Sequence, residues 1–321
     1  MKNDLYIFPG QGCQYVGIGS DIVKKYKSVS QLYELANDLL HFNVSELSFD
    51  GPEDQINLTK FTQPVLVTHQ LACFYALCEE LNTDLRPSIT AGHSLGEYTA
   101  LVVGGSLAPE QAIRLVAKRG ALMSELGTGS MMATTLTLDD ANRIASEVNC
   151  SIAGINLPEQ IVLAGLDGDL EKAINLIQRE FPKKRVIPLK TEGAFHSYLM
   201  KDAAAKFLVE LQNEDFKSPS IPVLSNYTGL PHENDPESII NNLYGQLFSP
   251  VRWLDCISYA LNQGASRVIE FGGGIGKGIE PSEKKPNLQA MMKKLSQHFE
   301  VETLYFSAIN TDSIEETAKH Y

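Results

Sequence analysis

Ser94 is the centre of the stretch of sequence with the clearest chemical potential. Gly92 and Gly96 flank it in the spacing G-x-S-x-G, between an apolar run at 87–91 and a helical pattern from Tyr98 onward. A strand, a tight turn and a helix in this order present a serine at the tip of a strained turn, where neighbours with a Cβ would collide. The turn also aims backbone N–H groups at a site where an oxyanion can be stabilised. The pattern predicts that Ser94 is a nucleophile.

A serine nucleophile needs a base within hydrogen-bond reach, and the best candidate is His196. It lies in a loop of small residues, 191–197, that enters a helix. His93 directly precedes the serine, so its side chain should point to the opposite side of the strand end. The other histidines have helical, tail or turn settings that suggest structural or surface roles (His41, His69, His232, His298 and His320).

A serine hydrolase of the familiar kind carries an Asp or Glu between Ser and His in chain order. In this chain the acids between Ser94 and His196 lie mostly in a segment that we predict to be an inserted domain. That position argues against a Ser-Asp-His triad.

Arg119 is a cation predicted to point inward. A helix is expected from Pro109 to about Leu126, with an apolar stripe on which Arg119 also falls (Ala112, Leu115, Val116, Leu122 and Met123). A buried cation is costly unless an anion meets it. The residues alone leave three interpretations open: a structural ion pair, a side chain that reaches the surface, or a binding site for an anion.

The composition of the 321-residue chain is that of a globular protein, with 43% hydrophobic and 21% charged residues. The net charge of −12 argues against general nucleic-acid binding and against binding to anionic membranes. The five cysteines are scattered without zinc spacing and indicate reduced thiols. With neither a signal peptide nor an apolar run of about 18 residues, we expect a cytoplasmic protein.

The order of predicted elements indicates an α/β fold with two domains. Residues 129–194 alternate as βαββαβ, which is typical of a ferredoxin-like unit. Residues 1–128 and 195–321 are expected to form a larger, α/β-hydrolase-like catalytic domain with a parallel sheet. The Gly-rich loop at 272–276 lacks the dinucleotide-binding spacing and is predicted to line a cleft.

The polar tail from Asn310 onward is expected to be frayed. Within it, Asp312-Ser313-Ile314 resembles a carrier-protein attachment motif, but the stretch is too short for such a domain. A helix cap is the predicted role of these residues.

Four motifs together resemble those of the malonyl-CoA:acyl carrier protein transacylases, in order and in spacing. They are Gly10-Gln11-Gly12, Gly92-His93-Ser94-Leu95-Gly96-Glu97, Lys118-Arg119-Gly120 and Ala194-Phe195-His196. The resemblance covers nearly the whole chain, including the predicted insertion.

The resemblance implies a role for each matching residue. Ser94 would be the nucleophile and His196 its base, oriented by the backbone carbonyl of Gln246 instead of an acid. The backbone N–H groups of Gln11 and Leu95 would form the oxyanion hole. Arg119 would hold the free carboxylate of malonyl, for which a guanidinium fork is well suited.

The implied reaction is ping-pong transfer of malonyl from malonyl-CoA, through a malonyl ester on Ser94, to the phosphopantetheine thiol of an acyl carrier protein. Leu95 and Phe195 resemble the residues of malonyl-selective members. The segment 270–277 resembles the free-standing acyltransferases that serve trans-acyltransferase polyketide synthases. Polyketide or fatty-acid biosynthesis is therefore expected, with no metal and no organic cofactor, and with neither nucleic acid nor membrane as a partner.

Two other classes of function compete with this interpretation. An acyl hydrolase that releases stalled acyl groups from carrier proteins would use the same serine and histidine, but a monoacyl substrate offers Arg119 no carboxylate. A non-catalytic scaffold that docks carrier proteins would not need Ser94, His196, Arg119 and Gln11 together.

Overall fold

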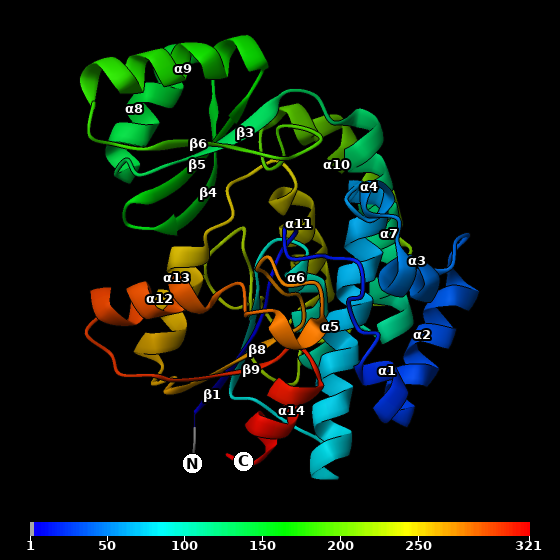
Figure 1. Ribbon diagram of the computed structural model, residues 1–321. Coiled ribbons are helices and arrows are strands. Elements are labelled where there is room, and N and C mark those ends of the chain that lie inside the picture. Colours follow the sequence, from blue (N-terminus) through cyan, green and yellow to red (C-terminus); the bar gives the residue numbers. More distant parts are fainter. Residues whose placement is uncertain (1–2) are drawn as a thin grey trace.

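The two sheets of this protein differ in strand direction, as the computed structural model of residues 3–321 shows (Figure 1). The larger sheet is parallel, with strand order β7-β2-β1-β8-β9. Its strands are β1 (Asp4–Phe8), β2 (Ile89–Gly92), β7 (Val223–Leu224), β8 (Arg267–Phe271) and β9 (Leu304–Ala308). Strands of such a sheet are covered on both faces, which explains their apolar runs in the sequence.

The period-two alternation of β1 divides the core of the larger sheet into two clusters. Tyr6 and Phe8 enter the larger cluster, whereas Leu5 and Ile7 enter the smaller one on the opposite face. The smaller cluster is covered by α12 (Trp253–Asn262) and α13 (Gln289–His298). The helices that contribute to the larger cluster are α1 (Ile22–Lys25), α2 (Lys27–Leu39), α3 (Val44–Asp50), α4 (Glu53–Ile56), α5 (Thr59–Leu81), α6 (Gly96–Val103), α7 (Pro109–Leu126), α10 (Lys201–Gln212), α11 (Pro236–Gln246) and α14 (Thr311–Ala318).

The smaller sheet is antiparallel, with strand order β4-β5-β3-β6. Helices α8 (Leu138–Val148) and α9 (Asp167–Glu180) lie together against it (Figure 1). The strands are β3 (Ser130–Thr134), β4 (Ser151–Leu157), β5 (Gln160–Gly165) and β6 (Val186–Leu189). The predicted βαββαβ order and the α/β fold class are confirmed, while the domain boundaries after residues 128 and 194 stay a prediction.

The small sheet also packs against the segment that carries His196. Met131 of β3 and Val162 of β5 share an apolar cluster with Phe195, directly before that histidine. The Ile155 N–H of β4 donates to the Val251 carbonyl at 2.9 Å, so a second backbone segment also joins the small sheet to the rest of the chain. Within residues 3–321, no helix combines the length and apolar character that a bilayer crossing requires.

The expectation of a frayed tail is wrong, because residues 311–318 form helix α14. Its start is capped by Asn310, whose side chain accepts from the Ser313 N–H at 2.9 Å, while the Ser313 hydroxyl accepts from the Asn310 N–H at 3.1 Å. The predicted capping role of this stretch is therefore confirmed. Ile314 is fully buried and anchors the helix in the larger core cluster.

Replacing Ile314 by Ala should lower the free energy of unfolding by about 2–5 kcal/mol, because it leaves a cavity in the core. Ile279→Ala is the matched control, since the Ile279 side chain is 81% exposed. Denaturant unfolding of both variants measures the difference. Equal, small effects of the two substitutions would contradict a packed C-terminal helix.

Candidate active site

Ser94 lies in the turn between β2 and α6, and its backbone is left-handed with φ = 53°. The two flanking glycines are required for space and not for φ. A Cβ on Gly92 would lie 1.9 Å from the carbonyl carbon of Gly96, and a Cβ on Gly96 would lie 2.3 Å from the carbonyl oxygen of Phe8. The helix start is thus pressed onto the ends of β1 and β2. Ser94 occupies the tip of this turn, in a conformation that costs about 1–3 kcal/mol for a non-glycine residue.

His196 meets Ser94 from a segment 102 residues away, with its Nε2 atom 2.8 Å from the serine Oγ. Its Nδ1–H donates to the backbone carbonyl of Gln246 at 2.7 Å. Because Nδ1 carries the proton, Nε2 is the acceptor that faces the serine hydroxyl. His196 is itself left-handed, with φ = 59°.

The environment of His196 keeps its ring neutral. Burial is the main cause and the positive charge of Arg119 the second, and together they lower the pKa of His196 from 6.5 to about 3. A neutral ring at physiological pH is the protonation state that a general base must have before it accepts a proton.

Arg119 lies on α7 and is 1% exposed, as the apolar stripe predicted. Its Nη2 donates to Ser94 Oγ and to Gln246 Oε1, each at 3.1 Å. Its Nε is buried without a hydrogen-bond partner within residues 3–321. The guanidinium also lies 5.8 Å from the centre of the Tyr98 ring. A buried cation with neutral oxygen atoms as partners retains the capacity to bind an anion.

Gln11 and Leu95 lie at the carboxyl ends of neighbouring parallel strands. Gln11 follows β1 and Leu95 follows β2, where Phe8 pairs with Gly92. A Cβ on Gly10 would lie 2.9 Å from the His93 carbonyl oxygen, so the loop after β1 touches the serine turn. The Gln11 side chain donates to Thr59 Oγ1 at 3.0 Å. The structure thus brings the two residues to the same end of the sheet as Ser94.

The two side chains proposed from the resemblance to select the acyl group are buried. Leu95 is 1% exposed in the larger core cluster. Phe195 is 5% exposed, next to His196, and packs with Met123 and Met200.

The other histidines near the site have partners of their own. His93 Nε2 lies 2.9 Å from Asn156 Oδ1 and its ring packs on Trp253, so it points away from Ser94 as predicted. His69 Nδ1 accepts from the Gly273 N–H at 3.0 Å. The Gly-rich loop therefore packs on α5. Of residues 272–276, only Gly276 lines a surface hollow, so the expected cleft-lining role is met at the end of the loop alone.

Three buried polar residues around the serine turn had no site role predicted from the sequence: Glu97, Asn226 and His232. Asn226 Oδ1 accepts from the Ser94 N–H at 2.6 Å, and its Nδ2 donates to the Gly92 carbonyl at 2.8 Å. Position in the chain could have indicated Asn226, because Asn226 follows β7 and Ser94 follows β2, so both lie at the carboxyl ends of neighbouring parallel strands. Sequence analysis also assigned only the backbone of Gln246, whereas its side chain contacts Arg119.

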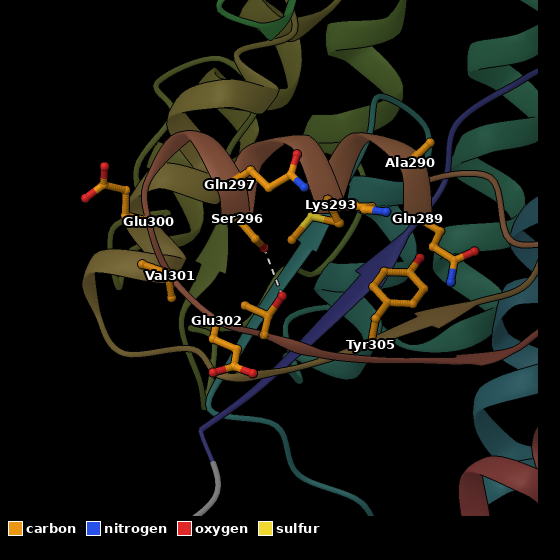
Figure 2. Close-up of a pocket in the computed structure, with 11 residues that line it drawn as sticks. Gln289, Ala290, Lys293, Ser296, Gln297, Glu300, Val301, Glu302 and Tyr305 are labelled. Atoms are coloured by element: carbon orange, nitrogen blue, oxygen red, sulfur yellow. Dashed lines mark hydrogen bonds between the residues drawn. The ribbon is translucent and has the colours of Figure 1, made fainter.

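A second surface hollow, of about 660 Å3, lies between α13 and the start of β9 (Figure 2). Ser296 Oγ and Thr303 Oγ1 are 2.9 Å apart there. None of the site residues predicted from the sequence lines this hollow. Within the described part of the chain, no three His, Cys, Asp or Glu side chains are grouped so that they could hold a metal ion.

The rate at which an uncharged sulfonyl fluoride modifies Ser94 should stay constant as the pH falls from about 8 to about 5. His196 stays in its neutral, basic form above its pKa of about 3, so the modification rate should not fall near pH 6.5, where an ordinary histidine titrates. Intact mass against time measures the rate at each pH, and His196→Asn is the control that lacks the base. A modification rate that falls to half of its maximum near pH 6.5 would contradict the described environment of His196.

Comparison with known proteins identifies relatives that share both sequence and fold. The sequence profile of the acyl transferase domain matches residues 5–272. A malonyl CoA-acyl carrier protein transacylase of Bacillus subtilis (strain 168) is 36% identical over 284 residues, covering 85% of this chain and 88% of that protein. The polyketide biosynthesis malonyl CoA-acyl carrier protein transacylase PksC of the same organism is 35% identical over 274 residues, covering 84% and 92%.

Solved structures agree with these sequence relatives. An acyl carrier protein S-malonyltransferase from Vibrio cholerae superposes with a TM-score of 0.87 at 31% identity, covering 98% of this chain and 100% of that one. A malonyl-transacylase in complex with its holo type II polyketide synthase acyl-carrier protein gives a TM-score of 0.88 at 31% identity, covering 100% of both chains.

Proposed function

Since the chain belongs to the acyl transferase domain family, we propose that it transfers malonyl from malonyl-CoA to the phosphopantetheine thiol of an acyl carrier protein. The observation that carries this proposal is Arg119, a buried cation 3.1 Å from the Ser94 hydroxyl whose hydrogen-bond partners are neutral. The malonyl group has a free carboxylate one methylene away from its thioester carbonyl. This carboxylate can provide the anionic partner that the Arg119 guanidinium does not have in the protein.

The first half-reaction loads the serine. Ser94 Oγ attacks the thioester carbonyl while its proton passes to His196 Nε2, which lies 2.8 Å away. The N–H groups of Gln11 and Leu95 donate to the oxyanion of the tetrahedral intermediate. The C–S bond then breaks, His196 returns the proton to the CoA sulfur, and malonyl remains as an ester on Ser94.

The second half-reaction reverses these roles. The carrier-protein thiol gives its proton to His196 and attacks the ester carbonyl, after which His196 protonates Ser94 Oγ as that oxygen leaves. The backbone carbonyl of Gln246 orients His196 in both halves, in the place where a triad would use a carboxylate. Leu95 and Phe195 shape the acyl pocket, where contacts discriminate one extra methyl group by about 1–3 kcal/mol.

The carrier protein belongs to polyketide or fatty-acid biosynthesis. One similar protein is named as a polyketide biosynthesis transacylase, at 35% identity, and another is a transacylase named without a pathway, at 36% identity. An acyl hydrolase would use the same Ser94 and His196, but its monoacyl substrates would leave Arg119 without a partner.

Replacing Arg119 by Ala should reduce loading of malonyl onto Ser94 by at least about a hundredfold, the equivalent of one charge-assisted ion contact in a buried site. Loading of acetyl from acetyl-CoA should fall much less, because acetyl has no carboxylate. Intact mass of the protein at short times after mixing measures both, and Ser94→Ala is the control that should carry no acyl group.

Equal losses for malonyl and acetyl would contradict the role proposed for Arg119. Malonyl labelling that survives Ser94→Ala would contradict the nucleophile. Release of the loaded acyl group to water, with no transfer to a holo carrier protein, would favour the hydrolase.

A further inference from the structure

Glu97 is a fully buried carboxylate on the first turn of α6, three residues after Ser94. Its Oε2 accepts from the Gln246 side-chain Nε2 at 2.7 Å and from the Asn226 backbone N–H at 3.0 Å. Its Oε1 lies 2.8 Å from His232 Nε2. The reaction described above uses none of these contacts directly.

The two residues in the first two contacts, Gln246 and Asn226, each bind a group of the active site directly. The Asn226 side chain holds the Ser94 N–H at 2.6 Å. The Gln246 side chain donates to the Ser94 carbonyl and accepts from Arg119, each at 3.1 Å, while its backbone carbonyl holds His196. Glu97 therefore directly contacts both residues that support the nucleophile, the base and the guanidinium.

Glu97, together with the Ser94 carbonyl, determines which end of the Gln246 amide faces Arg119. An ionised carboxylate only accepts hydrogen bonds, so it selects the NH2 group of the amide and leaves the oxygen for the guanidinium. The reverse orientation would place two donors against each other. Glu97 and the Ser94 carbonyl, which both accept from the Gln246 NH2 group, therefore keep the amide oxygen facing Arg119, and Glu97 makes the shorter and charge-assisted of the two contacts.

His232 is a further hydrogen-bond donor to Glu97. Asn242 Nδ2–H donates to His232 Nδ1 at 3.2 Å, so His232 Nε2 carries a proton and donates it to Glu97. Glu97 thus accepts hydrogen bonds from His232, from the Asn226 backbone and from the Gln246 amide, and the Gln246 amide lies between the carboxylate and the buried Arg119.

We propose that Glu97 is a positioning residue that acts through the Gln246 side chain to hold Arg119 ready for the substrate carboxylate. This role rests on the proposed malonyl transfer. It predicts that the charge of Glu97 affects malonyl loading more than acetyl loading, although Glu97 touches neither acyl group.

Glu97→Gln removes the charge and keeps the shape of the side chain. The expected result is a fall in the ratio of malonyl to acetyl loading on Ser94 of about tenfold, because a charge-assisted hydrogen bond is replaced by a neutral one. In an Arg119→Ala background, the same substitution should change both loadings by the same factor. Intact mass after mixing with malonyl-CoA or acetyl-CoA measures both loadings for the wild type, the two single variants and the double variant. Thermal unfolding confirms that all four proteins are folded.

Glu214→Gln is the matched control, because Glu214 forms an ion pair with Arg114, at 3.4 Å, outside the site. Loss of the Glu214 charge should leave the ratio of malonyl to acetyl loading unchanged. If the Glu97→Gln protein does not fold, Gln246→Met removes the same side-chain link while it retains the backbone carbonyl that holds His196. That variant should show the same loss of malonyl preference.

Equal losses of malonyl and acetyl loading in Glu97→Gln, or in Gln246→Met, would overturn the positioning role. A malonyl-to-acetyl ratio that is lower in the double variant than in Arg119→Ala alone would overturn it as well. A wild-type protein that forms no malonyl ester on Ser94 would instead overturn the proposed function. The wild-type measurement therefore separates the two failures.

Discussion

The guanidinium of Arg119 is buried beside the Ser94 hydroxyl, and its hydrogen bonds go to two neutral oxygen atoms. Removing such a charge from water costs several kcal/mol unless compensating groups surround it. The site supplies Gln246 Oε1, the face of Tyr98 and, behind the amide, the carboxylate of Glu97. This arrangement stabilises the cation without a direct ion pair. Under the proposed function, the substrate carboxylate would be the direct anionic partner of Arg119.

The same cation influences the base. Arg119 is the second cause, after burial, of the low pKa of His196. A carboxylate bound to Arg119 would offset that positive charge and raise the basicity of His196 when the substrate arrives. Acyl groups without a carboxylate would not have this effect. Under the proposed function, binding of malonyl to Arg119 would therefore favour proton transfer to His196. Ser94 and His196 both have left-handed backbones, at φ = 53° and 59°.

Most of the fold was predictable because its signals are local. The apolar run before Ser94, the βαββαβ rhythm and the stripe that places Arg119 inward each depend on the spacing of nearby residues. The roles of Glu97, Asn226 and the Gln246 side chain were not predicted, because their contacts join residues 127 to 152 positions apart. Helix α14 was missed because its pattern is thin, with only Ile314 and Thr317 buried.

The most direct measurement is the intact mass of the wild-type protein shortly after mixing with equal concentrations of malonyl-CoA and acetyl-CoA. The account predicts one malonyl group per chain, located on Ser94 by peptide mapping, with acetyl as a minor adduct. Acetyl on Ser94 in equal or greater amount would contradict the claim that the buried guanidinium selects a substrate with a carboxylate.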